Sequence, residues 1–147
     1  AAGVTPADVE AITLGSHGEE MGPIPSRATI KGRPLSVFLS EDQIDACVQD
    51  AITGGGQVVA LKKSGSATIA PAHSSIELID HMRGARTGPV PVSVMLEGEY
   101  GLDGVVLGVP AHLGLGGLVM VEELRLTEAE HKALHSAADA IRTRLGL

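Results

Sequence analysis

The stretch from Val90 to Leu124 restricts the possible folds more than any other part of the sequence. Valines at every second position from Val90 onward alternate with proline, serine and methionine, which is typical of a half-buried strand. Two further apolar segments follow, 105–109 and 118–124, joined by short links that contain glycine. Strands joined so closely pair with antiparallel neighbours. We therefore expect an antiparallel meander at the centre of the fold.

Hydroxyl caps predict the two helices with the clearest beginnings. Ser40 and Gln43 have the spacing of a capping box, and Thr127 and Glu130 repeat it. The glycines at 54–56 predict the end of the first of these helices. Before the first helix we expect a helical turn from Thr5, a strand over 9–14, a loop over 15–25 and a hairpin over 28–34. After it we expect a short helix over 57–63, with Val58, Val59 and Leu61 pointing inward, and a longer helix over 66–82. The last helix is expected to reach Leu145.

Together these elements predict one α+β domain over residues 1–147, an antiparallel sheet packed with several helices. The chain has one phenylalanine, one tyrosine and no tryptophan, so its core must be aliphatic. A net charge of -7 with scattered lysines and arginines argues against a nucleic-acid partner. No apolar run reaches the ~20 residues that a membrane helix needs. The single cysteine, Cys47, excludes an internal disulfide and suits the cytoplasm, which is the predicted location.

Neither glycine cluster predicts a nucleotide site. The glycines at 54–56 follow a predicted helix, whereas a phosphate site precedes one. The cluster at 114–117 lacks the third glycine and the strand-to-helix context of the dinucleotide fingerprint. By itself, then, this domain is not expected to bind a nucleotide through such a motif.

His17 is the histidine best placed for chemistry. It lies in a glycine-flanked loop after a predicted strand, beside Glu19 and Glu20, and an imidazole can exchange a proton near neutral pH. For the two adjacent carboxylates, solvent-facing charges are a better interpretation than an acid–base pair. His131 and His135 stand one helical turn apart, which suits a metal chelate, but no third ligand is evident. We therefore expect no metal, and the residues alone leave the role of His17 open.

Three ordered segments resemble the lactate/malate dehydrogenase family. Residues 15–21 (G-S-H-G-E-E-M) are similar to the stretch that holds the family's catalytic histidine. Residues 63–72 (K-S-G-S-A-T-I-A-P-A) are similar to a loop-to-helix segment on the substrate and nicotinamide side. Residues 100–110 (Y-G-L-D-G-V-V-L-G-V-P) are similar to a third motif of the family, Y-G-x-x-x-V-x-x-G-V-P. The likeness covers essentially the whole chain and implies the family's C-terminal substrate domain.

The resemblance implies a role for each matched residue. His17 would be the proton donor and acceptor in hydride transfer between NAD and a small 2-hydroxy acid. Gly18, Ser66 and Ala67 would contact substrate, and His17 and Ser66 would contact the cofactor. Alanine at 67, where many lactate enzymes of the family carry threonine, favours malate and oxaloacetate.

The sequence departs from the family pattern in three places. Ser16 stands where glycine often precedes the histidine, and Ser26, followed by Arg27, stands where an arginine is usual. The segment 68–69 lacks the aromatic residues of close relatives. These departures concern cofactor contacts and subunit packing.

The family's glycine-rich nucleotide domain, its substrate arginines and the aspartate that orients the histidine are expected upstream of this chain. NAD would be bound mainly by that N-terminal domain, which is the expected partner together with further copies in a dimer or tetramer. We expect these 147 residues alone to fold but not to turn over. Two alternatives stay open: a lactate-type 2-hydroxy acid oxidoreductase, and a non-catalytic oligomerisation or binding module that kept the fold.

Overall fold

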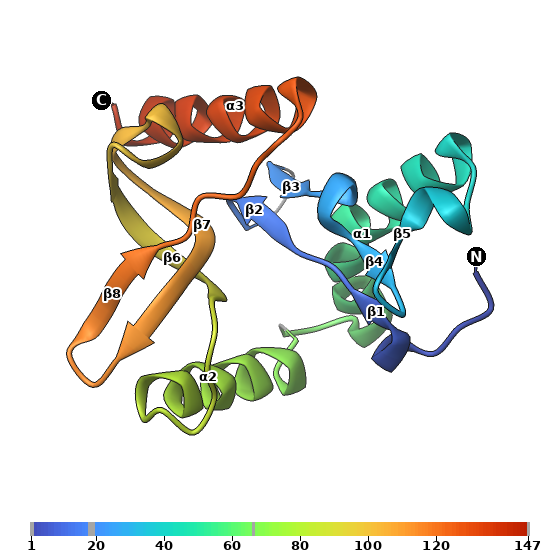
Figure 1. Cartoon of the computed structure of the whole chain (residues 1–147), viewed down its shortest axis with the longest axis horizontal. Coiled ribbons are helices and arrows are strands. Elements are labelled where there is room, and N and C mark those ends of the chain that lie inside the picture. Colours follow the sequence, from blue (N-terminus) through green and yellow to red (C-terminus); the bar gives the residue numbers. More distant parts are fainter. Residues whose placement is uncertain (1, 18–19, 66, 147) are drawn as a thin grey trace.

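The computed structural model describes residues 2–17, 20–65 and 67–146, which form antiparallel sheets packed with three α-helices (Figure 1). The expected meander is confirmed. Strand β6 (Val90–Glu97) pairs with β7 (Asp103–Gly114), and β7 pairs with β8 (Gly117–Val121), both antiparallel. β7 is longer than the predicted strand at both ends, and β8 ends three residues earlier than predicted, at Val121. The fold class is therefore α+β, as the alternating valines predicted.

The N-terminal strands belong to two different sheets. β2 (Thr13–Gly15) and β3 (Met21–Pro23) form a hairpin, and β2 joins the meander by pairing with β7. β1 (Val9–Glu10), β4 (Thr29–Ile30) and β5 (Arg33–Pro34) form a separate three-stranded sheet. The single strand predicted over 9–14 was therefore wrong, because the chain leaves one sheet and enters the other within it.

Four short 3₁₀ helices connect these described elements. The turn predicted after Thr5 is η1 (Pro6–Asp8), in which the Thr5 amide donates to the Asp8 carboxylate at 3.2 Å. The segment predicted as a loop over 15–25 contains β3 and the start of η2 (Pro25–Arg27). The hairpin predicted over 28–34 is confirmed by β4 and β5, and η3 (Leu35–Val37) and η4 (Glu99–Gly101) complete the set.

Helix α1 (Glu41–Lys62) corrects the predicted stop at residues 54–56. The Ser40 box is present as expected, with the Gln43 amide donating to the serine hydroxyl at 3.4 Å, but the helix runs on through all three glycines. Each glycine costs a helix interior about 1 kcal/mol relative to alanine without breaking its hydrogen bonds. The helix ends instead at Lys63, in the left-handed region (φ 61°). Val58, Val59 and Leu61 belong to this helix and are exposed, so the prediction that they point inward was wrong.

Helix α2 (Ile69–Met82) begins three residues later than predicted, after Thr68. Helix α3 (Glu128–Leu145) matches its prediction, with the Thr127 and Glu130 capping box in place. In Figure 1, α3 lies along β2 and β3 on one side, while α2 lies on the opposite side of the meander. No helix in the described part of the chain is long and apolar enough to cross a membrane.

The buried core forms where α3 meets the meander and the β2–β3 hairpin. Its members are aliphatic apart from one tyrosine, and they come from β2, β6, β7, α3 and the turns between them. Neither α1 nor α2 contributes a buried residue. The buried residues of this cluster are Leu14, Ile24, Leu96, Tyr100, Leu102, Val105, Leu107, Val109, Leu134, Ala137 and Ala138.

Candidate functional site

His17 lies in the five-residue loop of the β2–β3 hairpin. Gly15 and Met21 are paired at the base of this loop, and His17 is exposed. Gly18, which was predicted to contact substrate, and its neighbour Glu19 lie outside the described residues.

Two glycines let this loop approach the central strand closely. Gly15 has a left-handed backbone (φ +92°), and a Cβ there would lie 3.0 Å from the carbonyl oxygen of Glu20. Gly15 also pairs with Gly108 of β7, where a Cβ would lie 3.0 Å from the Gly15 carbonyl oxygen. No larger residue fits at either position without a backbone shift. The first and third sequence motifs therefore meet beside His17.

A hollow of about 600 Å³ opens beside the histidine loop. Ser93 of β6 pairs with Gly108, so Ser93, Gly108 and Gly15 form a row across three strands. Helix α2 closes the opposite wall with Ser74 and Leu78. The full lining is Thr13, Leu14, Gly15, Ser16, His17, Met21, Ser74, Leu78, Pro91, Val92, Ser93 and Gly108.

Ser74 and Ser93 line the hollow and were not among the residues predicted from the sequence. Ser93 is a polar residue in an otherwise valine-rich run, and Ser74 follows the second motif by two positions. These were the only sequence signals, because the register that brings Ser93 to Gly108 depends on the β6–β7 pairing. The hollow thus combines an imidazole with neutral hydroxyl groups.

The charge of the hollow is low. Among the described residues that line it there is no lysine, arginine, aspartate or glutamate. Within the described ranges the His17 ring also has no hydrogen-bond or ion-pair partner. The described lining therefore places the His17 imidazole beside neutral groups and contains neither a carboxylate nor a cation.

Of the other predicted substrate residues, only Ala67 lies within the described ranges, and it does not line the hollow. Ala67 is half-buried just before α2, and Ser66 lies outside the described residues. Glu20 is not solely a solvent-facing charge, because its carboxylate binds the Arg144 guanidinium at 2.7 Å. The substrate and cofactor contacts assigned to Gly18, Ser66 and Ala67 stay predictions.

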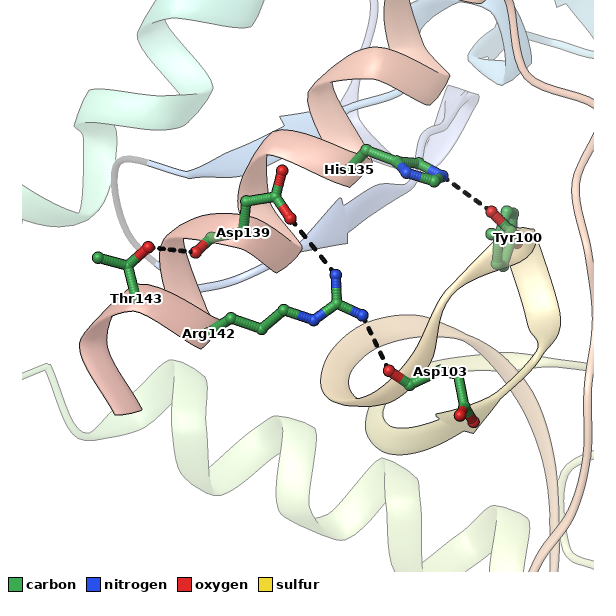
Figure 2. Close-up of polar contacts among 6 residues, drawn as sticks. All are labelled: Tyr100, Asp103, His135, Asp139, Arg142 and Thr143. Carbon is green, nitrogen blue, oxygen red and sulfur yellow. Dashed lines mark hydrogen bonds and ion pairs between the residues drawn. The ribbon is translucent and has the colours of Figure 1, made fainter. Parts of the chain in front are cut away.

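His131 and His135 form a stacked pair on α3, with ring centroids 4.3 Å apart. Nε2 of His135 donates to the Tyr100 carbonyl at 2.9 Å (Figure 2), so this nitrogen carries a proton and is not a free metal ligand. Among the described residues no three histidine, cysteine, aspartate or glutamate side chains are grouped as a metal site would need. The geometry gives the metal alternative no support.

Glu130 is a buried carboxylate on the side of α3 next to η2. The Ser26 hydroxyl and amide donate to its carboxylate at 2.7 and 3.1 Å, and the amide and hydroxyl of Thr127 donate to it at 2.8 and 2.9 Å. Burial raises the pKa of Glu130, but these four hydrogen bonds outweigh burial and leave the pKa below its ordinary value. Ser26, where the family usually has arginine, is thus a partner of the α3 cap.

Comparison with known proteins gives matches over the whole described chain. A family model of the lactate/malate dehydrogenase alpha/beta C-terminal domain matches residues 1–146. Malate dehydrogenase from Roseiflexus sp. (strain RS-1) is 39% identical over 140 residues, which cover 95% of this chain and 45% of the relative. The chain therefore spans about half the length of the curated relatives that it matches.

Solved structures share the fold as well. Malate dehydrogenase from Cryptosporidium parvum superimposes with a TM-score of 0.93 at 32% identity, over 99% of this chain and 48% of that one. Lactate dehydrogenase from the same organism, solved with lactic acid and nicotinamide adenine dinucleotide, gives 0.90 at 32% identity, over 96% and 46%. With the family model matched from end to end, the chain belongs to the lactate/malate dehydrogenase family and contains its alpha/beta C-terminal domain.

Proposed function

We propose that this chain is the histidine-bearing half of an NAD-dependent malate dehydrogenase. The observation that carries the proposal is His17, held in a short loop where two family motifs meet beside a hollow of about 600 Å³. The curated relatives found at 38–41% identity are named malate dehydrogenases. Because the chain spans 45% of such a relative, the complete enzyme would include an N-terminal nucleotide domain.

His17 would act as the proton donor and acceptor. In the reducing direction its protonated ring donates a proton to the carbonyl oxygen of a 2-oxo acid and stabilises the developing alkoxide. In the oxidising direction the neutral ring accepts the proton of the substrate hydroxyl. Such general acid–base catalysis contributes roughly 10²- to 10⁴-fold to a rate.

The residues of this domain fit one side of a nicotinamide cofactor and not the rest of it. The hydroxyl groups of Ser16, Ser74 and Ser93 are neutral donors and acceptors beside His17, suited to a ring and its amide. The cofactor, when bound, supplies or accepts the hydride. Phosphates need cations or a glycine-rich helix start, and the described lining of the hollow has neither. NAD would therefore be bound mainly by the N-terminal domain.

Malate and oxaloacetate are the proposed substrates, and a lactate-type activity is the alternative. Ala67 supports the first, since a small residue leaves room for a second carboxylate. The likeness to the Cryptosporidium parvum lactate dehydrogenase supports the second. A cytoplasmic location and a dimer or tetramer, with this chain's apolar faces in the interfaces, remain part of the proposal.

The test uses the full-length polypeptide that carries this sequence. Purified protein should oxidise malate with NAD and reduce oxaloacetate faster than pyruvate, as followed by NADH absorbance. Replacing His17 by asparagine should lower kcat about 10²- to 10⁴-fold with little change in NADH affinity. His131→Asn, on an exposed ring of α3, is the matched control and should leave kcat unchanged.

The alternatives predict different results. Faster reduction of pyruvate would identify a lactate-type enzyme, and Ala67→Thr should move the preference in that direction. Absence of activity with either acid in a folded full-length protein would favour a non-catalytic module. The 147 residues alone should not turn over, and malate oxidation by them would show that the proposed second half is unnecessary.

A further inference from the structure

Helix α3 is fastened to the meander by two side chains on one face. His135 and Arg142 are seven residues apart, close to two full helical turns. Nε2 of His135 donates to the Tyr100 carbonyl at 2.9 Å, and the Arg142 guanidinium donates to the Asp103 carbonyl at 2.9 Å and binds Asp139 at 3.3 Å (Figure 2). Both acceptors are backbone carbonyl groups, that of Tyr100 in η4 between β6 and β7 and that of Asp103 at the start of β7. This face therefore fixes the position of the helix relative to the sheet.

A second face of the same helix contacts the histidine loop. Ala137 and Arg144 are also seven residues apart. The Ala137 methyl group lies 3.4 Å from the position that a Cβ on Gly15 would take. The Arg144 guanidinium binds the Glu20 carboxylate at 2.7 Å. Gly15 and Glu20 lie on either side of His17, so α3 contacts both ends of the loop.

We propose that Arg144 is a positioning residue for His17. It links Glu20 to a helix that is itself fixed to the sheet, and so limits how far the histidine loop can move. The inference rests on the proposed function, in which His17 exchanges a proton with substrate. Small displacements of a reacting group lower rates strongly, even when the change that causes them is remote.

Exposure indicates which property Arg144 controls. The side chains are 58% exposed for Arg144 and 33% for Glu20, and ion pairs this exposed contribute little to folding. Removal of Arg144 should therefore change the placement of His17 much more than the stability of the protein. The pair also joins residues 124 positions apart, so nothing local in the sequence predicts it.

The test measures kcat, KM and thermal stability of full-length variants. Arg144→Gln should lower kcat for oxaloacetate roughly 3- to 10-fold, with the KM for NADH unchanged and the Tm within about 2 °C of wild type. Lys132→Gln is the matched control, because it removes one positive charge from an exposed side chain of the same helix that has no ion pair among the described residues. It should behave like wild type.

Charge rescue separates a positioning role from a merely structural one. Arg144→Lys should retain most of the activity, and Arg144→Glu should lose more than Arg144→Gln. Combining Arg144→Glu with Glu20→Arg should restore kcat to within about twofold of wild type, because the pair is rebuilt with its charges exchanged. Failure of the exchange to restore kcat in a folded double variant would overturn the proposal.

The NMR signal of the His17 ring, assigned with His17→Asn, decides the matter if no turnover is found. Inactive wild type would refute the proposed function and not the contact. In that case Arg144→Gln should still shift or broaden the His17 signal, and Lys132→Gln should not. The positioning role is overturned if Arg144→Gln leaves kcat unchanged in an active enzyme, or the His17 signal unchanged in an inactive one.

Discussion

Helices α1 and α3 begin with the same capping signal but differ in how many of their residues are buried. Both open with a capping box, on Ser40 and on Thr127. Yet α3 buries four residues in 18, whereas α1 buries none in 22. α2 resembles α1, and apolar side chains on the pair reach 82% exposure at Leu61 and 86% at Ile69. Capping thus specifies where a helix starts, and among the three described α-helices only α3 has residues buried in the core.

The exposed apolar side chains of α1 and α2 fit the proposal that a further domain or a further copy packs against these helices. Exposed aliphatic surface of this extent is unusual on a domain that functions alone. The same argument applies to the β8 hairpin, where Leu118, Val119 and Met120 are exposed. The contrast between α3 and the α1–α2 pair can be tested by substitution, as follows.

The largest effect is expected for Leu134→Ala. Leu134 is 3% exposed in the α3 core, and truncating a leucine so buried costs about 2–5 kcal/mol of unfolding free energy. Urea denaturation of this 147-residue chain measures the loss. A cost under about 1 kcal/mol would mean that α3 is no better packed than α1, and the comparison would fail.

Glu130→Gln should have the next largest effect and should depend on pH. The folded-state pKa of Glu130 is lowered, so its stabilisation is complete above the ordinary value of 4.5 and is lost as the pH falls through the lower folded pKa. At pH 7 the variant should lose about 1–3 kcal/mol, because an amide cannot accept all four hydrogen bonds. Below pH 4.5 its stability should fall less steeply than that of wild type.

Glu128→Gln is the control for this pH dependence, because Glu128 is exposed in the same first turn of α3. Its stability should follow the wild-type curve. Parallel curves for wild type and Glu130→Gln between pH 3 and 5 would contradict the assignment.

A smaller effect of opposite sign is expected within α1. Beyond its own stretch of helix backbone, a methyl group added at Gly55 would meet no atom of the described residues within 4 Å. Gly55→Ala should therefore stabilise the helix by about 0.5–1 kcal/mol. Circular dichroism during urea unfolding measures the gain. Destabilisation in this chain would show that the glycines are required by a contact on this face.

The smallest effect is expected for Leu61→Ala in this chain, within about 0.5 kcal/mol of wild type. The same substitution in the full-length protein sharpens the comparison. If a domain or copy covers α1, the cost there should rise above 1 kcal/mol, as for a buried leucine. Equal small costs in both proteins would show that α1 stays uncovered.

Sequence patterns predicted the elements whose signals are local. The alternating valines from Val90 and the caps at Ser40 and Thr127 each identified an element correctly. The glycines at 54–56 misled because a glycine run weakens a helix without being obliged to end it. Propensity alone cannot distinguish the two outcomes.

For the candidate site, the sequence and the family resemblance predicted His17 but not the residues that surround it. Ser93 reaches the hollow through its register with Gly108, and Arg144 reaches Glu20 across 124 positions. Such contacts depend on the assembled sheet and on the docking of α3, which no short sequence pattern encodes. The orienting carboxylate and the substrate cations expected upstream stay predictions.

Tyr100 is a natural spectroscopic probe of the contact between η4 and α3. It is the only tyrosine in a chain without tryptophan, and it is buried with a left-handed backbone (φ 56°). Its hydroxyl donates to the Glu122 carbonyl and accepts from the Leu124 amide, and its own amide donates to Glu123. Burial, opposed by the Leu124 hydrogen bond and aided by the charges of Glu123 and Glu122, raises the pKa of this phenol.

Tyrosine absorbance and tyrosine fluorescence therefore report only on the place where η4, between β6 and β7, meets α3. Far-ultraviolet circular dichroism, in contrast, sums all three helices. Unfolding curves from the two signals will coincide if the chain melts as one unit and separate if α1 and α2 melt earlier. A single unlabelled sample can thus reveal whether the two kinds of helix share one folding transition.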